Sequence, residues 1–307
     1  MIEVYFLGTA GTVPTKNRNL ISVCIKRKSH IFLFDVGENT QKQMLISKIS
    51  VVKLHSIFIT HLHGDHLMGL PGILMSANLM NREKELLIYG PPGIRKFVNS
   101  IQDSIILNLN YNVKVIEIEN EGIILETDEY TIYAGLAEHN CFCLFYVLQE
   151  KPRPGKFNRQ KAIELGIPMG PLWKKLQNGE DIILEDGRKI YSTQVVGSPR
   201  PGLKIVFAID TRPSQKIKKA AENADLLIMD GTFDYSLLEK AIETKHCTSR
   251  EAAILAKEAN VKKLALTHIS SRYTDTLKLY NDVKDIFPNT IIPDDLTKLT
   301  IKYQDGV

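Results

Sequence analysis

The sequence is short of the residues that build disulfide frameworks and membrane anchors. Its cysteines are Cys24, Cys141, Cys143 and Cys247, and none of them forms a Cys-x-x-Cys pair, which argues against a zinc ribbon or a disulfide scaffold. No apolar run is long enough to span a bilayer, and no charged-then-apolar leader opens the chain. We therefore expect free, buried thiols and a cytoplasmic protein with no membrane partner.

Charge and composition place few limits on function. The net charge is +4 and the isoelectric point is near 8.7, a balance that is mildly compatible with a polyanionic partner and proves nothing alone. Hydrophobic residues make up 44% of the chain, as in ordinary soluble globular proteins. The length of 307 residues is sufficient for a large core in one or two domains.

One short stretch concentrates metal-binding residue types. The apolar run 57–60 predicts a buried strand, and His61, His63, Asp65 and His66 follow it directly. Protonated together, these imidazoles would repel one another, whereas neutral imidazole and carboxylate are ligands that zinc prefers. His61 and His63 can reach one ion, and Asp65 and His66 can reach a second. The alternative is a polar loop with scattered histidines, a common false positive for short motifs.

The order His-x-His-x-Asp-His after a strand resembles the metallo-β-lactamase superfamily of two-metal hydrolases. That resemblance implies an α/β fold, a four-layer αββα sandwich with the metals at the ends of the strands. We expect residues 1–307 to form a single domain of this type. The motif is shared by many relatives, so it does not yet give a substrate.

Four strand-like segments each deliver a metal-competent side chain at or just beyond the carboxyl end. They are 57–60 before His61, 131–138 before His139, 203–209 before Asp210 and 263–267 before His268. A lone histidine is more often structural than a ligand, so the joint placement is the evidence. We hypothesise that one ion is held by His61, His63, His139 and Asp210, and the other by Asp65, His66, Asp210 and His268. Asp210 bridges, because one carboxylate has two oxygens to share.

His246 lies between two of these segments, at the start of a predicted helix. A histidine at a helix start is commonly a surface residue. From its position alone, a surface role and a functional role for His246 are about equally supported. The functional reading makes His246 a general acid that reaches the metal site.

Residues 151–202 interrupt the pattern of the core. Their composition shifts toward proline, glycine and basic residues, and the stretch 185–188 is typical of a hairpin turn. We interpret the segment as an inserted arm that projects from the core and carries a short helix and a small hairpin. The alternative, a structureless surface loop, conflicts with a length of about fifty residues. The basic side chains singled out in the arm are Lys151, Arg153, Lys156, Arg159, Lys174 and Lys175.

The remaining pattern predicts further strands and helices. Expected strands include 2–7, a hairpin of 20–26 with 30–34, and then 86–89, 113–118, 123–125, 141–148 and 226–229. Expected helices are a segment capped by Asn39 that runs to Ile49, and then 67–80, 212–223, 249–259 and 273–285.

Other segments sharpen the resemblance to one family within the superfamily. In this sequence they read Phe6-Leu-Gly-Thr9, Pro14-x-Lys16-x-Arg18-Asn19, Phe34-Asp-x-Gly37-Glu, Leu70-Pro-Gly72, Gly166-Ile-Pro-x-Gly-Pro171, Leu184-Glu-Asp-Gly-Arg188, Asp210-Thr-Arg212, His246-x-Thr248 and Leu266-Thr-His-Ile-Ser-x-Arg272. Together with the histidine motif they resemble the tRNase Z family. They run through nearly the whole chain in the family's order.

The resemblance implies a zinc-dependent endoribonuclease that hydrolyses the phosphodiester at the 3′ side of precursor tRNA, leaving a tRNA 3′-hydroxyl and a trailer 5′-phosphate. It implies two Zn²⁺ per subunit, with Mn²⁺ or another divalent ion as an alternative. It also implies a homodimer in which the arm is an exosite that grips the tRNA elbow. Lysines and arginines on an arm contact phosphates without reading sequence, which suits an enzyme that accepts every tRNA by shape.

The same resemblance assigns roles around the cleavage site. Asp65 is the proton acceptor that positions the hydroxide, and His246 protonates the leaving 3′ oxygen. Lys16 and Arg18 match the family's loop near the cleavage site, although charge alone favours a solvated turn there. Thr248 matches the segment near the scissile phosphate.

This sequence departs from the family pattern at two positions near His246. The segment after the strand at Leu226 carries Asp230 where the family often has a longer glutamate, so a shorter carboxylate is the candidate to orient His246. Cys247 replaces the commoner serine. These changes affect the geometry expected for the general acid rather than the reaction class.

Two other functions compete with this one. A different hydrolase of the superfamily, acting on a small phosphodiester, a sulfate ester or a lactone, gives no reason for the basic arm. A non-catalytic RNA-binding protein with a structural metal needs neither two ions nor an unligated His246 beside them.

Overall fold

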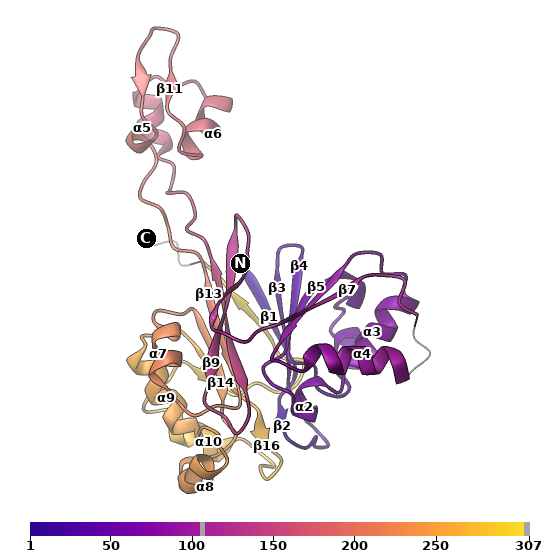
Figure 1. Cartoon of the computed structure of the whole chain (residues 1–307). Helices are drawn as coiled ribbons and strands as arrows, with labels where there is room; N and C mark the ends of the chain where they lie inside the picture. The colour runs from indigo at the N-terminus through magenta and orange to yellow at the C-terminus, as the bar shows by residue number, and fades with distance from the viewer. Residues whose placement is uncertain (105–107, 304–307) are drawn as a thin grey trace. The chain divides into compact units, whose positions relative to one another are not determined.

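The computed structural model describes residues 1–104 and 108–303 (Figure 1). It divides into two compact units. The first unit consists of Met1–Thr127, Thr131–Gln149 and Leu203–Lys302, and the second of Asp128–Tyr130, Glu150–Gly202 and the segment that begins at Tyr303. No helix in the described residues is long and apolar enough to cross a bilayer.

Two seven-stranded sheets form the centre of the first unit as described. In the first sheet the strand order is β18-β1-β3-β4-β5-β6-β7, and in the second it is β17-β15-β14-β13-β10-β9-β8. The strands of the first sheet are β1 (Ile2–Gly8), β3 (Ser22–Arg27), β4 (His30–Phe34), β5 (Leu54–Phe58), β6 (Leu86–Gly90), β7 (Val113–Glu117) and β18 (Lys298–Ile301). Those of the second are β8 (Gly122–Glu126), β9 (Tyr130–Ala137), β10 (Cys143–Glu150), β13 (Lys204–Ala208), β14 (Leu226–Asp230), β15 (Leu264–Thr267) and β17 (Thr290–Ile291).

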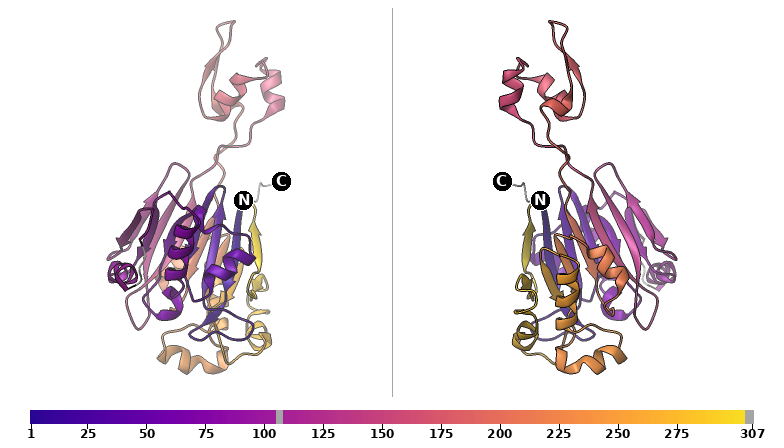
Figure 2. Two further views of the ribbon diagram at one scale, coloured as in Figure 1. Left: turned by 90° about the vertical axis from the view of Figure 1, so that its right-hand side faces the viewer. Right: turned by 90° about the vertical axis from the view of Figure 1, so that its left-hand side faces the viewer.

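Helices cover the outer face of each sheet (Figure 2). Those packed on the first sheet are α1 (Thr40–Ile46), α3 (Leu70–Leu79) and α4 (Ile94–Ser104), which bury Met44, Ile73 and Val98 against strand residues such as Leu33 and Ile88. Those packed on the second sheet are α7 (Gln215–Ala221), α9 (Ser249–Glu258) and α10 (Leu277–Val283), whose Ile217, Ala253 and Val283 meet Val206 and Leu227. The shorter helices are α2 (Gly64–Leu67) and α8 (Leu238–Glu243).

Aromatic rings fill the layer between the two sheets. Successive side chains of a strand point to opposite faces, so Phe34 of β4 faces the second sheet while Leu33 faces the helices. The Phe34 ring lies 5.4 Å from Phe207, and the Phe58 ring lies 5.4 Å from Tyr146. The Tyr146 hydroxyl donates a hydrogen bond to the Ile59 carbonyl at 2.6 Å. The layers are therefore helix, sheet, sheet and helix, which confirms the predicted α/β sandwich.

An early strand and a late strand pair with each other in this unit. β1 pairs with β18 in antiparallel register, with Ile2 opposite Ile301. A two-stranded sheet joins β2 (Ala10–Gly11) to β16 (Ile269–Ser270) in parallel. These pairings hold the loop after β1 beside the segment that follows β15.

The predicted strands are present, whereas several predicted helices are shorter or divided. α1 ends at Ile46 rather than Ile49, and Asn39 occupies its N-cap with a positive φ of 68°, so its side chain bonds Asn19 instead of capping the helix. The expected helix 67–80 is divided into α2 and α3, because the Gly69 N–H donates to the carbonyl of Val36.

Two further helices start later than predicted. The expected helix 212–223 begins at Gln215, because the Ser214 side chain caps it by accepting the Ile217 N–H. The expected helix 273–285 begins at Leu277.

The second unit has a small core of its own. It contains α5 (Arg159–Glu164), α6 (Pro171–Gln177) and the hairpin of β11 (Ile182–Ile183) with β12 (Lys189–Ile190). Its buried side chains are Ala162, Ile167, Leu176, Ile182, Leu184, Ile190 and Val195. The sequence suggested a short helix here, and the structure has two, because Gly170 with φ 138° turns the chain before Pro171 begins α6.

Candidate metal centre

Strand ends bring the metal-competent residues together. β13, β14 and β15 are parallel, so their carboxyl ends lie at the same edge of the second sheet. Asp210 follows β13 by two residues, and His268 follows β15 directly. In the first sheet β5 ends at Phe58, just before His61. The polar residues therefore lie just beyond the carboxyl ends of apolar strands from both sheets.

Asp210 lies between imidazoles from both sheets. Its Oδ2 is 3.3 Å from His61 Nε2 and 3.2 Å from His66 Nε2. The same oxygen is 3.9 Å from His139 Nε2. Its Oδ1 is 3.0 Å from His268 Nε2. One carboxylate thus touches both groups of histidines that the sequence separated into two sites.

The remaining candidates complete these two groups. His63 Nδ1 lies 2.8 Å from His61 Nε2. Asp65 Oδ2 lies 3.5 Å from His66 Nε2 and 3.4 Å from His268 Nε2, and it accepts the Thr12 N–H at 2.8 Å. All seven side chains assigned as ligands from the sequence are therefore neighbours.

Imidazole nitrogens in this cluster are buried without a hydrogen bond. His66 Nε2 and His139 Nε2 face the Asp210 carboxylate but have no hydrogen-bond partner within residues 1–104 and 108–303. A buried polar atom without a partner is destabilising. Ligand atoms of His61, His66 and Asp210 lie within 4.8 Å of one another, and so do those of Asp65, His66 and His268. Imidazole nitrogens and carboxylate oxygens in this arrangement fit divalent metal ions.

A buried carboxylate, Asp35, orients two of the histidines. Asp35 follows β4, and its Oδ2 accepts the His66 Nδ1–H at 2.8 Å. The Thr60 hydroxyl donates to the same oxygen at 2.9 Å and lies 2.9 Å from His61 Nδ1, so His61 donates its Nδ1–H to Thr60. Both imidazoles therefore turn Nε2 toward Asp210, as outer hydrogen bonds do for metal-binding histidines.

Asp230 plays the matching part in the second sheet. Its Oδ1 accepts the Thr232 hydroxyl at 2.5 Å, and Thr232 Oγ1 lies 2.9 Å from His268 Nδ1. Its Oδ2 accepts the His246 Nδ1–H at 2.9 Å. The shorter carboxylate noted in the sequence thus reaches His246. Asp35, Thr60 and Thr232 were not predicted as site residues, although Asp35 and Thr60 each lie at the end of an apolar run.

Tight backbone geometry accompanies these residues. Asp35, Asp210 and His268 have positive φ values of 53°, 51° and 60°. Such conformations cost about 1–3 kcal/mol each for residues other than glycine, and they gather at functional sites. Gly11 of β2 leaves room for the His268 ring, because a Cβ atom there would lie 2.4 Å from it.

Burial and the carboxylates divide the histidines into two electrostatic classes. Burial lowers the pKa of His61 to about 4 and also lowers the pKa of His139. Burial would lower the pKa of His66 as well, but Asp35 and Asp210 outweigh it and raise that pKa well above the usual value. For His268 the Asp210 carboxylate prevails over burial and raises the pKa to about 10.

The surroundings of His246 favour its protonated form. Burial would lower its pKa, but the Asp230 carboxylate outweighs burial and raises the pKa above the ordinary value. Arg212 fixes the segment from the other side, since its guanidinium donates to the His246 carbonyl at 2.6 Å and pairs with Glu251.

The residues predicted to bind substrate lie in different surroundings. Lys16 is exposed on its loop, whereas the Arg18 side chain is 11% exposed and donates to Thr9 and Asp294. Thr248 is fully buried and caps α9 in a capping box with Glu251. The six basic arm residues belong to the second unit.

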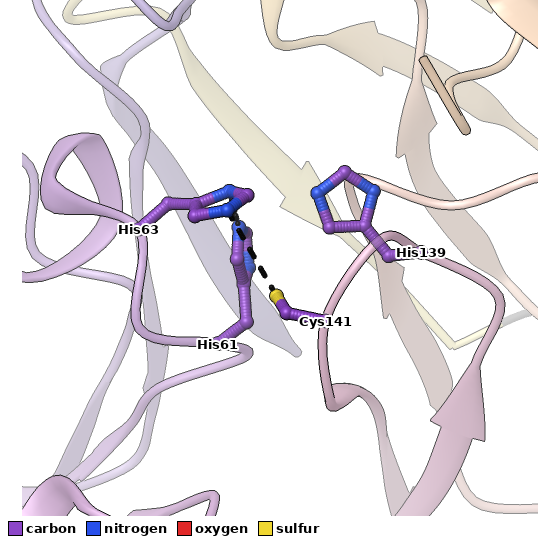
Figure 3. A group of neighbouring side chains, drawn as sticks. All are labelled: His61, His63, His139 and Cys141. Atoms are coloured by element: carbon purple, nitrogen blue, oxygen red, sulfur yellow. Dashed lines mark hydrogen bonds between the residues drawn. The ribbon is translucent and has the colours of Figure 1, made fainter. Parts of the chain in front are cut away.

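Cys141 lies at this centre, although the sequence suggested only free buried thiols. Its side chain is exposed, and Sγ is 4.0 Å from His63 Nε2 (Figure 3). Cys24, Cys143 and Cys247 are free and buried as expected. The spacing of the cysteines gave no signal for this placement.

Comparison with known proteins identifies the family. The family model described as anti-Pycsar protein Apyc1 matches residues 2–104. Ribonuclease Z of Methanosarcina acetivorans is 44% identical over 305 residues, which cover 99% of this chain and 99% of that protein. Ribonuclease Z of Methanothermobacter thermautotrophicus is 43% identical, with 100% of this chain and 99% of that protein covered. The chain belongs to the ribonuclease Z family.

Solved structures agree on the fold. Human tRNase Z, short form, matches with a TM-score of 0.69 and 24% identity over 98% of this chain and 99% of that chain. A metallo-β-lactamase fold protein of Bacillus subtilis matches with a TM-score of 0.66 and 20% identity over 98% of this chain and 100% of that one. The metallo-β-lactamase fold and the tRNase Z resemblance are thus confirmed. This member of the ribonuclease Z family is a hydrolytic endoribonuclease.

The raised pKa values predict that metal binding releases protons. At pH 7 the metal-free protein holds protons on His66 and His268, and a bound ion requires neutral imidazoles. In Asp35→Asn the carboxylate that holds the His66 proton is lost, so we expect about one proton fewer to be released per protein. We also expect metal affinity to fall about 10- to 100-fold. Calorimetric zinc titrations in buffers of different ionisation enthalpy measure both quantities.

Asp225→Asn is the control, because Asp225 is also buried but lies at the amino end of β14. It should release as many protons as the unaltered protein. Equal proton release by Asp35→Asn and the unaltered protein would contradict the assignment of the proton to His66.

Proposed function

We propose that the enzyme uses two divalent metal ions to remove the 3′ trailer of precursor tRNA, leaving a 3′-hydroxyl on the tRNA and a 5′-phosphate on the trailer. The relatives named ribonuclease Z and the fold shared with human tRNase Z support this substrate. The observation that carries the proposal is the Asp210 carboxylate between the two histidine groups. Seven ligand residues exceed the four that a zinc ion takes, so one ion does not account for them.

The donor set favours zinc, with Mn²⁺ or another divalent ion as an alternative. One ion would be held by His61, His63, His139 and Asp210, and the other by Asp65, His66, Asp210 and His268. Bound together, two such ions activate water and neutralise the charge that develops on a phosphodiester.

Asp65 and His246 handle protons on opposite sides of the scissile bond. Burial would raise the pKa of Asp65, but hydrogen bonds from His268 and His66 hold it well below its usual range. Asp65 is therefore an anion at neutral pH and orients the attacking water by accepting its hydrogen. Because Asp230 holds Nδ1–H of His246, the Nε2 proton is the one that His246 delivers to the leaving 3′ oxygen.

The loop that carries Lys16 serves the substrate phosphate. Lys16 is exposed, and its ammonium group is available to a phosphodiester. Arg18 acts mainly by anchoring this loop, because its guanidinium is engaged by Thr9, the Pro293 carbonyl and Asp294. Thr248 contributes by capping α9 and fixing the position of the neighbouring His246.

The second unit is the exosite for the tRNA. Lys156 and Arg159 are exposed and line a groove of about 1040 Å³ together with Lys161 and Arg200. Lys174 and Lys175 are exposed on α6. Lys151 is half-buried, and Arg153 packs its guanidinium over the Tyr303 ring at 3.5 Å. Exposed cations without base-specific partners suit recognition of the tRNA backbone.

The bridging role of Asp210 predicts the outcome of two substitutions. Asp210→Ala should lose bound metal and turnover together, whereas His246→Asn should keep its metal and lower kcat by about 10²- to 10⁴-fold, the usual contribution of a general acid. Elemental analysis gives the metal content, and cleavage of one precursor tRNA with and without chelator, with both product ends mapped, gives the reaction. Full metal content in a folded Asp210→Ala protein would contradict the bridge.

If the arm is an exosite, it should be needed for cleavage of precursor tRNA and not for cleavage of a small phosphodiester. Deleting residues 152–196 should lower kcat/KM for precursor tRNA while cleavage of a small phosphodiester is retained. Lys156→Ala with Arg159→Ala should do the same and reduce the salt dependence of binding, by about one unit of log–log slope for each lost phosphate contact. Lys218→Ala with Lys219→Ala, an equal loss of charge on α7, is the control. Unchanged tRNA cleavage by the deletion variant would refute the exosite.

A homodimer is the expected assembly, and we expect it to act in the cytoplasm. Leu45 on α1 and Leu79 on α3 are 76% and 78% exposed, with Ile46 and Met80 exposed beside them. Exposed apolar side chains that gather on one surface indicate a protein interface.

Charges on that surface should separate the subunits. Leu45→Lys with Leu79→Lys should sediment as a monomer and the unaltered protein as a dimer. Leu277→Lys, at a leucine on α10 that is 64% exposed, should stay dimeric. A monomeric unaltered protein would exclude this assembly.

A further inference from the structure

We propose that Cys141 is an additional ligand of the ion held by His61, His63, His139 and Asp210, so that this position offers three imidazoles, one carboxylate and a thiolate. The inference rests on the proposed assignment of that ion and adds a residue to it. Ligand atoms of Cys141 and the three histidines all lie within 4.8 Å of one another in the metal-free structure.

The distances are close to those of a coordinated ion. Zinc bonds of about 2.0–2.1 Å to nitrogen and 2.3 Å to sulfur place tetrahedral ligand atoms about 3.3–3.6 Å apart. Cys141 Sγ lies 4.0 Å from His63 Nε2, so a contraction of less than an ångström completes the set. Cys141 lies in the turn between β9 and β10, and its side chain is exposed, which leaves the thiol free to make this movement.

A second observation also indicates that an ion binds at this position. The His139 side chain is only 2% exposed, and its Nε2 has no hydrogen-bond partner in the described part of the chain. Its Nδ1 faces the Lys245 carbonyl at 3.3 Å, so Nε2 is the nitrogen that presents a lone pair. Figure 3 shows His139 and Cys141 on one turn, facing the His61 and His63 rings across a shared space.

Coordination by the thiol changes which metal ions this position binds most tightly. A sulfur–metal bond forms as the thiol proton passes to solvent, and no redox partner is needed. Thiolate is a soft ligand that favours Zn²⁺ and Cd²⁺, whereas carboxylate and water suit Mn²⁺ and Mg²⁺. As a fifth protein ligand, beyond the three imidazoles and Asp210, the thiolate also occupies a vertex that catalytic zinc sites leave open for water or substrate. Cys141 therefore tightens the site for soft ions and competes with substrate for that vertex.

The neighbouring cysteine provides the control. Cys143 is buried, and its Sγ is 3.9 Å from His61 Nδ1 and 3.6 Å from the Asp210 backbone carbonyl, whereas the Asp210 carboxylate lies at the other ring nitrogen, Nε2. Cys24 is buried in the first sheet opposite Leu33, in an apolar cluster that also contains Met44. Neither thiol faces the ligand nitrogens, so replacing either one should leave a Cys141–metal bond intact.

Cobalt substitution tests the proposal without reference to activity. In full-length protein loaded with Co²⁺, we expect a sulfur-to-cobalt charge-transfer band in the near ultraviolet. The band should persist in Cys143→Ala and Cys24→Ala and disappear in Cys141→Ser. Cys141→Ser should also weaken Cd²⁺ binding by about tenfold or more, the size of effect that loss of one group around a metal produces, with little change for Mn²⁺.

Each other result overturns the ligand role. A thiol that only accepts a hydrogen bond from His63 gives no band in the unaltered protein. A band that survives in Cys141→Ser, or that disappears in Cys143→Ala alone, assigns the sulfur elsewhere. Precursor tRNA cleavage by the unaltered zinc protein is measured separately. Cleavage without a band rejects the ligand and keeps the proposed function, whereas a band without cleavage does the reverse.

Discussion

The structure depends on one carboxylate, that of Asp210, which is buried among imidazoles supplied by two sheets. A buried charge is strongly unfavourable unless opposite charges or metal ions compensate for it. Without an ion, protonated His66 and His268 compensate for the Asp210 charge. Burial would raise the pKa of Asp210, but these two histidines outweigh it and hold that pKa well below the usual value. With ions, the same atoms are ready to act as ligands. The two sheets therefore meet at an electrostatic contact as well as an apolar one.

In each sheet, hydrogen bonds with an aspartate and a threonine orient the histidines at that contact. Asp35 holds His66 directly and His61 through Thr60, and Asp230 holds His246 directly and His268 through Thr232. In both halves an aspartate and a threonine hydroxyl set the orientation of an imidazole pair. Rotamers and tautomers are thus fixed by hydrogen bonds that do not involve an ion. A site arranged beforehand loses little conformational entropy when a metal binds.

Much of this arrangement can be predicted from the sequence. Apolar runs indicate the strands, and the His or Asp that follows each run marks where the strand ends. The seven ligand candidates form one cluster for that reason, even though Asp210 is 149 residues from His61 by sequence number. Asp35 was missed because an aspartate two residues before a glycine, here Gly37, is also typical of an ordinary turn. Arg18 resembled a free cation, and only the tertiary contact with Asp294 shows that it is engaged. The exposure of Cys141 depends on the path of one turn, which local pattern does not determine.

The pairing of β1 with β18, and of β2 with β16, has a consequence for the order in which the molecule is made. Strands β1 and β2 lie far along the sequence from their partners, because Ile2 pairs with Ile301 and Ala10 pairs with Ile269. The edge of β1 stays open until residue 301 has emerged, and His268 arrives only shortly before. A nascent chain therefore carries the histidine motif at 61–66 without the rest of its centre. A chain that stops before residue 268 lacks one of the seven proposed ligands and the partner strand of β2, so the metal centre is complete only after the second sheet has been made through β15.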